Sequence, residues 1–455
     1  MGSHRNGFNK ESFILSVDVG TTSIRCHVVP LYPEVGHVEM DPEAIWEGFI
    51  TVVKGAVQDA GVHMRQIEAL GISTQRGTFT TWDRRDEGAL LLHQTETVAG
   101  SKSSRLLPQH VTFRLVWALT HYKQVRQAAT KGNCCFGTID TWLLFKLTKG
   151  QVHATDYSNA SATGMFDAFQ VYDFGYTDPS IFGLPIPIMS VIADQQAAMF
   201  GECCFDVGDV KITMGTGTFM DINTGNKPHT SSAGLYPLVG WKIGSEVVYL
   251  AEGNAADTGT AIKWAQELEL FSDVQETSDM AYSVSDSDGV CFVPSFNGLQ
   301  APLNDPKACA SLMGLKPSTT KSHLVRAILE SVAFRNKQLY DTTLRETHIP
   351  ITKIRVDGGV SSNNFVMQLT ADLFGRKVSR PHHYEMSCLG AAFVAGLGVG
   401  YWRSREELKK LQRADDAFLP KGVPNGSASS PSREYIPVIQ SWEKALRRSM
   451  NWYKP

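Results

Sequence analysis

The sequence predicts an α/β protein built from two related domains. Strand-like and helix-like patterns alternate along the chain, and that alternation is typical of folds in which helices cover a sheet. A strand that ends in a tight turn of glycine and threonine occurs once in each half, after Phe13–Val19 and again after Lys211–Met214. Two copies of one design indicate an internally duplicated fold with two facing domains.

Both copies predict β-hairpins. In the first, Ile24–Val29 is the expected return strand, and in the second, Phe219–Ile222 returns after the turn Gly215–Thr218. Backbone N–H groups and hydroxyls gathered at such a turn suit the oxygens of a phosphate. For either copy alone a plain structural turn is the simpler interpretation, but the repetition favours a phosphate site. Asp18, at the end of the first strand, adds a carboxylate that can hold Mg²⁺ beside a phosphate.

Hydrophobic periodicity predicts the remaining elements. Apolar residues recur at helical spacing over Pro42–Ala60 and over His323–Thr342, so both segments are expected to be amphipathic helices. The stretch Gly422–Arg433, rich in Gly, Pro and Ser, predicts a surface loop, and a domain boundary is expected near Phe205–Asp209. The other expected elements are the strands Ile67–Ser73, Ile188–Ile192 and Ile354–Val356, and the helices Ala193–Cys204, Asn364–Leu373 and Ile439–Trp452.

Composition narrows the class of protein. A chain of 455 residues with 42% hydrophobic and 20% charged residues is typical of a soluble protein of two or three domains. Its net charge of −3 offers no general basic field for nucleic acid or an anionic membrane. The apolar segment Leu389–Trp402 is too short and glycine-rich to span a bilayer, and Met1–Glu11 lacks the apolar run of a secretory signal. Eight cysteines without CxxC spacing favour reduced thiols and a cytoplasmic location.

Two strand-to-helix junctions carry residues suited to phosphoryl transfer. Asp194 follows a predicted strand and opens a helix, where a carboxylate can act as general base toward an attacking hydroxyl. A helix N-cap is the commoner role of such an aspartate, and both roles can coexist. At the second junction, Gly358 and Gly359 allow close backbone approach, and the Asn363 side chain can bond an adenine or ribose edge. A plain turn between strand and helix is the alternative there.

Taken in order, these segments resemble the FGGY carbohydrate kinases, and within that family the glycerol kinases. The resemblance extends from Phe13 to Trp452 and therefore covers nearly the whole chain. The matching strings are SVDVGTTSIR at Ser16–Arg25, GISTQR at Gly71–Arg76, GTIDTWLLFKLTKGQVHATDYSNASATG at Gly137–Gly164, ADQQAAMFG at Ala193–Gly201, MGTG at Met214–Gly217, PSFNGLQAPLNDP at Pro294–Pro306, VDGGVSSNNFVMQ at Val356–Gln368 and LGAAFVAGLGVGYW at Leu389–Trp402.

The resemblance implies two actin-like ATPase (ribonuclease H-like) domains with a cleft for nucleotide and substrate between them. Residues 12–205 would form the N-terminal, acceptor-side domain, and residues 206–452 the C-terminal, nucleotide-side domain. The implied reaction transfers the γ-phosphoryl group of ATP, with Mg²⁺, to glycerol and yields glycerol 3-phosphate. The resemblance also implies self-association, and no nucleic-acid partner is expected.

The family's functional positions are carried onto this chain where its motifs match. Asp194 matches the general base, and Asp18 matches the carboxylate on the metal side. The acceptor would be held by Arg76, Gln195 and Phe219. The matching positions for phosphate and nucleotide are Thr21, Thr22, Arg25, Thr216, Gly259, Lys263, Gly359 and Asn363.

The acceptor side departs from the family pattern. Gly77 stands where glycerol kinases have a glutamate that accepts hydrogen bonds from glycerol, and Gln109 stands roughly where they have a tyrosine. The family's W-x-D-x-R segment has no counterpart in Arg84–Pro108, and too few residues separate Val29 from Tyr32 and Asp167 from Phe182. The N-terminal domain therefore looks shortened. These departures leave open a kinase for another small polyol or sugar, or a nucleotide-binding scaffold with little turnover.

Overall fold

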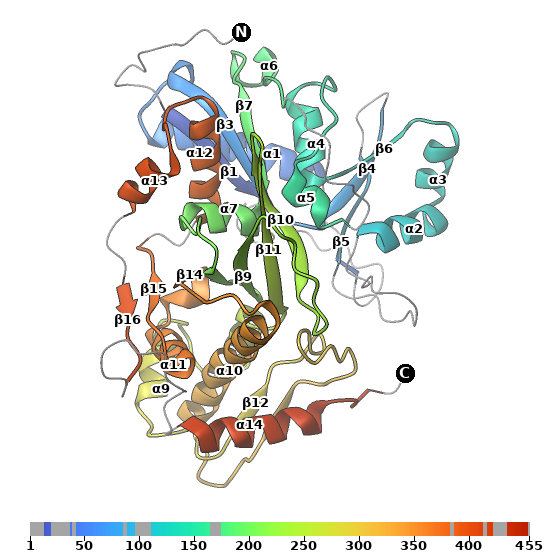
Figure 1. The fold of residues 1–455 in the computed structure, drawn as a ribbon. Helices are drawn as coiled ribbons and strands as arrows, with labels where there is room; N and C mark the ends of the chain where they lie inside the picture. The colour runs from blue at the N-terminus through green and yellow to red at the C-terminus, as the bar shows by residue number, and fades with distance from the viewer. Residues whose placement is uncertain are drawn as a thin grey trace. The chain divides into compact units, whose positions relative to one another are not determined.

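The computed structural model describes residues 13–19, 37–38, 42–84, 89–95, 111–163, 174–382, 386–412, 416–421 and 435–453. They form two compact units, whose elements are labelled in Figure 1. The first unit contains the chain up to Cys203 together with Val239–Ser245 and Met386–Gln412. The second contains the remaining segments between Cys204 and the C-terminus. The predicted domain boundary at residue 205 stays a prediction. In the structure, two segments that come later in the chain also pack with the first unit.

The main sheet of the first unit is parallel. Its strands are β1 (Phe13–Val19), β3 (Ile67–Thr74) and β7 (Ile188–Ala193), in the order β1-β3-β7. In register, Asp18 lies opposite Ser73. Parallel strands place their carboxyl ends at one edge of the sheet, which is where ligands bind in open α/β folds.

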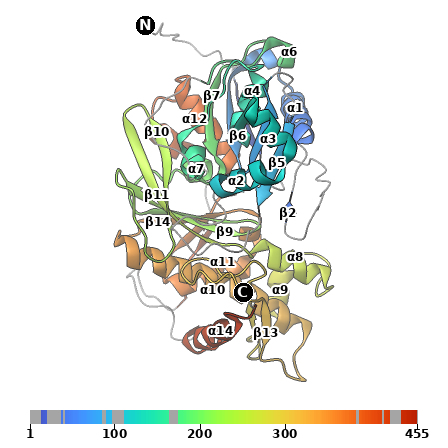
Figure 2. The ribbon, with the colours of Figure 1, turned by 90° about the vertical axis from the view of Figure 1, so that its right-hand side faces the viewer.

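Helices cover both faces of this sheet because its side chains alternate in direction. On β7, Val191 packs into a core that also holds residues of α1 (Pro42–Asp59) and α4 (Ile139–Leu147). The next residue, Ile192, packs on the other face against α12 (Met386–Gly398) and α7 (Asp194–Gly201). Figure 2 shows α12 and α7 on one side of β7, with α1 and α4 on the other.

The helices α12 and α7 touch through their backbones. A Cβ atom added at Gly390 would lie 1.7 Å from the Ala197 carbonyl oxygen, so only glycine fits there. This close packing holds α7 firmly against α12, and α7 begins with Asp194.

A second, antiparallel sheet of the first unit follows the order β2-β5-β4-β6. Its strand β5 (Ala89–Thr95) lies within Arg84–Pro108, the stretch that has no counterpart of the family's W-x-D-x-R segment. This strand pairs with β4 (Phe79–Asp83). The other elements of this unit are β2 (His37–Val38), β6 (Cys134–Thr138), η1 (Met64–Gln66), α2 (Val111–His121), α3 (Lys123–Thr130), α5 (Tyr157–Ser161), α6 (Pro179–Phe182) and α13 (Arg405–Leu411).

A mixed sheet with the strand order β10-β11-β9-β8-β14-β15-β16 contains most strands of the second unit. The unit's long helix α10 (Lys321–Thr347) packs against β9 and β11, and α11 (Asn364–Phe374) lies beside α10 (Figure 1). The strands are β8 (Asp209–Met214), β9 (Thr218–Gly225), β10 (Tyr236–Ile243), β11 (Glu246–Ala255), β14 (Lys353–Asp357), β15 (Val378–Arg380) and β16 (Asp416–Phe418). The remaining elements are α8 (Gly259–Glu267), α9 (Glu276–Tyr282), β12 (Cys291–Val293), β13 (Ser311–Met313), η2 (Gly359–Ser362) and α14 (Ile436–Ser449).

Most predicted elements are confirmed. The second hairpin forms as expected, because β8 and β9 pair antiparallel around Gly215–Gly217. The helices predicted at Pro42–Ala60 and His323–Thr342 exist as α1 and the longer α10. The return strand predicted at Ile24–Val29 and the loop predicted at Gly422–Arg433 lie outside the described residues. None of the helices described is long and apolar enough to cross a membrane.

Candidate active site

The first half of the candidate site lies in the first unit, where its parallel strands end. Asp18 is the last residue but one of β1, Arg76 follows β3 by two residues, and Asp194 follows β7 directly. The topology of a parallel sheet thus gathers three predicted site residues at one edge.

Asp194 and Arg76 form an ion pair that remains partly open to solvent. Arg76 Nε lies 3.6 Å from Asp194 Oδ1, and the two side chains are 11% and 22% exposed. The same carboxylate oxygen accepts the Gln195 N–H at 2.7 Å. The N-cap interpretation of Asp194 is wrong: Ala193 occupies the cap position, and Asp194 is the first residue of α7. A carboxylate in the first turn of a helix is favoured by the helix dipole.

The residues that flank this pair are held tightly. Gln195 is buried, as is Arg114 of α2. Gly77 has a φ of 73°, in the left-handed region that favours glycine, and its carbonyl accepts a hydrogen bond from Arg114 Nη2. A Cβ at Gly77 would lie 3.3 Å from that nitrogen. A buried guanidinium therefore stands beside the position where the resemblance expects a carboxylate, and burial lowers the pKa of Arg114 to about 10.

Two carboxyl groups of the first unit have raised pKa values: Asp140 is buried, and Asp156 is half-buried. Burial, aided by the charge of Asp156, raises the pKa of Asp140 to about 7. Burial also raises the pKa of Asp156, although hydrogen bonds from Ser158 and Asn159 act in the opposite direction. All four residues belong to the string that matches the family between Gly137 and Gly164, but their roles follow only from the folded arrangement.

The second half of the candidate site belongs to the second unit and begins at the turn Gly215–Gly217. The carbonyl of Thr216 accepts the N–H groups of Thr258 at 3.1 Å and Gly259 at 2.8 Å. Those bonds occupy N–H groups at the start of α8, so that helix end is already capped from within the chain. The side chain of Thr216 is exposed.

The two glycines that follow β14 have different surroundings. Gly358 has a φ of 85°, and a Cβ there would lie 2.6 Å from the Met214 carbonyl oxygen, so this glycine packs against the end of β8. Gly359 is exposed, and a Cβ added there would meet nothing within 4 Å. Asn363 caps α11: its Oδ1 accepts the Val366 N–H at 3.0 Å, and its Nδ2 donates to Thr277 Oγ1 at 2.9 Å.

Other predicted residues take the following places. Lys263 is exposed on α8, and its Nζ lies 3.8 Å from Oε1 of Glu267. Phe219 is half-buried on β9 in the second unit, whereas Asp194 belongs to the first. The predicted phosphate residues Thr21, Thr22 and Arg25, and the departure at Gln109, lie outside the described residues.

The second unit contains a buried group of charged residues that was not predicted from the sequence. Lys211 Nζ lies 2.9 Å from Asp221 Oδ2, and both side chains are fully buried. Asp357, at the end of β14, accepts a hydrogen bond from Thr213 on β8. Burial raises the pKa of Asp357 to about 6, although the Lys211 ammonium acts in the opposite direction. The signal was available, since the hairpin register places Lys211 directly opposite Asp221.

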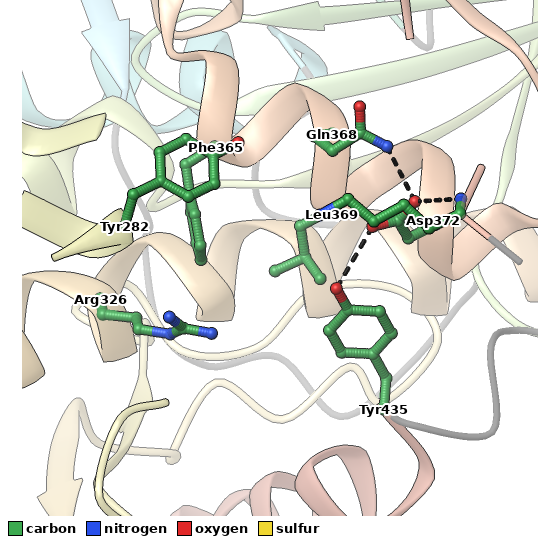
Figure 3. A pocket seen from close by; sticks show the side chains of 8 residues that line it. Tyr282, Arg326, Phe365, Gln368, Leu369, Asp372 and Tyr435 are labelled. Carbon is green, nitrogen blue, oxygen red and sulfur yellow. Dashed lines mark hydrogen bonds between the residues drawn. The ribbon is translucent and has the colours of Figure 1, made fainter. Parts of the chain in front are cut away.

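A pocket in the second unit is lined by none of the predicted site residues (Figure 3). Asp372 accepts hydrogen bonds from Gln368 Nε2 at 2.8 Å and from the Tyr435 hydroxyl at 3.2 Å. The Arg326 guanidinium stacks over Phe365, 5.2 Å from the ring centre. Because these polar groups bind one another, the pocket ties α11 to the start of α14 and receives no ligand assignment. Its lining residues are Tyr282, Arg326, Phe365, Gln368, Leu369, Asp372, Lys421 and Tyr435.

Comparison with known proteins identifies the family. A relative named glycerol kinase 5 from Danio rerio is 62% identical over 528 positions, which span 100% of this chain and 99% of the relative. A relative of the same name from Homo sapiens is 50% identical over 97% of this chain and 96% of the relative. Models of the FGGY carbohydrate kinases match residues 28–93 and 93–189 (N-terminal domain) and 210–399 (C-terminal domain).

The chain belongs to the FGGY family of carbohydrate kinases. The predicted family resemblance is therefore confirmed. Two strings, CCFG at Cys134–Gly137 and RSMNW at Arg448–Trp452, resemble the paralogues named glycerol kinase 5, and the relatives confirm that finer resemblance as well.

A solved structure supports the fold class. The crystal structure of Plasmodium falciparum glycerol kinase with ADP matches with a TM-score of 0.78 and 28% identity over 91% of both chains. The predicted fold class of an FGGY kinase with two actin-like ATPase domains is confirmed.

The alignments also bear on the shortened N-terminal domain. The alignment with the Danio rerio relative has 528 positions, whereas this chain has 455 residues. The alignment therefore contains positions at which this chain has no residue. The N-terminal family model matches in two pieces that meet at His93, within the stretch from Arg84 to Pro108.

Proposed function

We propose that the protein transfers the γ-phosphoryl group of ATP to glycerol and forms glycerol 3-phosphate. The observation that carries this proposal is the partly exposed Asp194–Arg76 pair at the carboxyl edge of the first sheet. Membership of the FGGY family, with relatives named glycerol kinase, supplies the class of reaction and the acceptor.

The proposed chemistry needs one proton acceptor and firm positioning. Asp194 takes the proton from an acceptor hydroxyl as that oxygen attacks the γ-phosphorus, and the bond to the bridging oxygen of ADP breaks. Arg76 orients the carboxylate through the ion pair and, with Gln195, holds the remaining hydroxyls. Phe219 packs against the carbon skeleton of the acceptor. No covalent intermediate is required, because phosphoryl transfer depends mainly on positioning and charge neutralisation.

The nucleotide is assigned to the second unit and to the first phosphate turn. Thr216 offers its exposed hydroxyl to a phosphate, and Lys263 supplies a mobile positive charge. The open space at Gly359 accommodates the nucleoside, and Asn363 supports that loop by capping α11. The remaining proposed contacts are Gly259 and, in the first turn, Thr21, Thr22 and Arg25.

Asp18 is the proposed carboxylate for Mg²⁺. Within the described ranges, no cluster of three or more His, Cys, Asp or Glu could hold a metal without other ligands. One carboxylate nevertheless fits Mg²⁺, which takes oxygen ligands and in nucleotide enzymes is completed by phosphate oxygens and water. When bound, the ion would neutralise charge on the phosphates, while Asp18 would hold it at the end of β1.

Composition and family resemblance support three further assignments. The net charge of −3 fits an enzyme that binds a small polyol and no nucleic acid, and the cysteine usage fits a cytoplasmic location. Self-association is proposed by resemblance to the family. We also retain 12–205 as the acceptor-side domain and 206–452 as the nucleotide-side domain.

Two alternatives rest on specific observations. Because Gly77 stands where glycerol kinases have a glutamate, the acceptor side lacks that carboxylate. This difference favours a kinase for another small polyol or sugar. The alignment positions without a counterpart in this chain favour a nucleotide-binding scaffold with little turnover. Both alternatives preserve the nucleotide half of the site and change the acceptor half.

The test is ADP release from MgATP by the purified full chain, measured with and without glycerol. Stimulation by glycerol, with glycerol 3-phosphate as product, is the expected result. Stimulation only by another member of a polyol and sugar panel would replace glycerol as the acceptor. Bound ATP without turnover on any acceptor would favour the scaffold.

A further inference from the structure

The short helix α5 lies between the ends of the two strands that lead to the reacting groups. Thr74 is the last residue of β3, two residues before Arg76, and Ala193 is the last residue of β7, directly before Asp194. Each of these strand ends is hydrogen-bonded to a side chain of α5.

Ser158 makes the connection to β7. Its hydroxyl oxygen accepts the Ala193 N–H at 2.8 Å and donates its own proton to Asp156 Oδ2 at 2.5 Å. Because Ala193 is the N-cap of α7, this bond fixes the backbone at the point where Asp194 enters the helix.

Asn159 makes the connection to β3. Its side-chain oxygen accepts the Thr74 hydroxyl at 3.4 Å, and its amide nitrogen donates to Asp156 Oδ1 at 2.7 Å. Both strand ends are therefore tied to the same carboxylate, one through Ser158 and the other through Asn159.

Asp156 is the hub of the arrangement. Besides the two side chains, it accepts the backbone N–H groups of Ser158 at 2.6 Å and Asn159 at 3.1 Å, as the N-cap of α5. Ser158, Asn159 and Thr74 are fully buried. A buried polar cluster stabilises a defined geometry only when its groups are paired with one another, and here the hub accepts four donors.

We propose that Asp156, Ser158 and Asn159 form a positioning brace that sets the relative placement of Asp194 and Arg76. The brace touches neither substrate nor nucleotide and acts through the ends of β7 and β3. The proposal rests on the proposed function, since Asp194 and Arg76 are the groups whose chemistry it serves.

Loss of each arm of the brace is expected to change a different kinetic constant. Ser158 supports the general base, so its loss lowers kcat. Thr74 and Asn159 support Arg76, which holds acceptor hydroxyls, so loss of that arm raises the KM for glycerol. The affinity for ATP should be unaffected by either change, because the brace bonds to the ends of β3 and β7, whereas the proposed nucleotide contacts follow β1 or belong to the second unit.

Ser158→Ala is the principal variant, and Ser190→Ala is its matched control. Ser190 lies on the same strand β7, is buried, and donates to the Ala391 carbonyl at 3.1 Å, away from the reacting edge. Both variants remove one buried hydroxyl; Ser158→Ala removes its two hydrogen bonds, to the Ala193 N–H and to Asp156, and Ser190→Ala removes one. Ser158→Ala should lower kcat about 10- to 100-fold, as expected for a misplaced catalytic group, whereas Ser190→Ala should leave kcat unchanged at a similar melting temperature. Ser158→Thr, which keeps a hydroxyl, should recover most of the lost rate.

A kcat for Ser158→Ala equal to that of Ser190→Ala would overturn the brace. If Ser158→Ala does not fold, Thr74→Val tests the other arm, because it removes one 3.4 Å bond and keeps the side-chain shape. It should raise the KM for glycerol about threefold to tenfold, roughly the effect of one neutral hydrogen bond. An unchanged KM in that variant would also contradict the proposal.

Hydrogen–deuterium exchange separates failure of the brace from failure of the proposed function. In Ser158→Ala the peptide containing Ala193 should exchange about tenfold faster than in the wild type, since its N–H loses its acceptor. Ser190→Ala should leave exchange at Ala193 unchanged. If the wild type does not phosphorylate glycerol, the proposed function fails while this readout still tests the brace, and unchanged exchange in Ser158→Ala would refute it.

Discussion

Each of the two units has an ion pair close in sequence to predicted site residues, and the two pairs differ in exposure. In the second unit, Lys211 and Asp221 lie 2.9 Å apart and both side chains are 0% exposed. In the first unit, Arg76 and Asp194 lie 3.6 Å apart and remain accessible. A sealed pair cannot meet a substrate, whereas a partly open pair can exchange a proton with one. The comparison therefore separates charge that organises the fold from charge that can perform chemistry.

The sealed pair has a local cause. Lys211 on β8 and Asp221 on β9 are direct cross-strand neighbours in the hairpin that carries Thr216. Their attraction offsets part of the cost of burying two charges, and it joins the two strands just behind the phosphate turn. The pair thus supports the hairpin that carries Thr216.

Breaking the sealed pair should have the largest effect on stability. Lys211→Met leaves the Asp221 carboxylate buried without its cation and should lower the free energy of unfolding by about 3–5 kcal/mol. Denaturant unfolding of the full chain provides the measurement. The control is the double variant Lys211→Met with Asp221→Leu, which should recover most of the loss; equal stability of the single variant and the wild type would contradict a sealed pair.

The first unit also contains a fully buried carboxyl group, that of Asp140. Its pKa of about 7 lies above the ordinary value of 3.8, so the folded chain holds this proton more tightly than the unfolded chain. Stability due to Asp140 is therefore present below pH 4 and is lost as the pH rises toward 7. Asp140→Asn should match the wild type near pH 4 and exceed its stability at pH 8 by up to about 4 kcal/mol. Unfolding curves across that range give the difference, and a difference independent of pH would refute the assignment.

The glycine pair tests the nucleotide half by matched substitutions. Gly358→Ala places a Cβ 2.6 Å from a carbonyl oxygen at positive φ and should cost about 1–3 kcal/mol of stability. Gly359→Ala meets nothing in the protein and should leave the melting temperature unchanged, yet weaken ATP binding, since the added methyl group intrudes into the proposed nucleoside space. Calorimetric titration with ATP and thermal melts distinguish the two. Tight ATP binding by Gly359→Ala would remove the nucleotide from that loop.

Gly77 gives the smallest expected effect and tests the acceptor half. Gly77→Glu would bring a carboxylate beside Arg114, at a cost of about 1–2 kcal/mol for a side chain at positive φ. If the missing glutamate weakens acceptor binding, this variant should lower the KM for glycerol, by at most about tenfold for one hydrogen bond. Gly77→Ala carries the same backbone strain without the carboxylate and should not lower the KM. A KM for Gly77→Glu that equals or exceeds the wild-type value would count against a lost acceptor contact.

Local sequence patterns were sufficient where one segment determines its own structure. The β8–β9 hairpin follows from the glycine-threonine turn between two short apolar strands, and α10 follows from its helical spacing. The place of Asp194 at a strand-to-helix junction was also predictable. Its N-cap alternative failed because the helix begins one residue earlier than a cap at Asp194 requires.

The support of the site could not be predicted in this way. Ser158 meets Ala193 across 35 positions, and Thr74 meets Asn159 across 85. Such contacts depend on which strand ends the parallel sheet brings together, and no local periodicity encodes them. The hydrogen bond from Arg114 to Gly77 is another example, since it spans 37 positions between a helix and a turn.

The central claim is that the accessible carboxylate of Asp194 accepts the proton of the acceptor hydroxyl. The most direct measurement is transfer of labelled γ-phosphoryl from ATP to glycerol by the wild type and by Asp194→Asn, with ATP affinity measured on both proteins. We predict that the variant loses turnover by about a thousandfold, within the range for a general base, and still binds ATP. Turnover by Asp194→Asn within about tenfold of the wild type, below that range, would contradict the account.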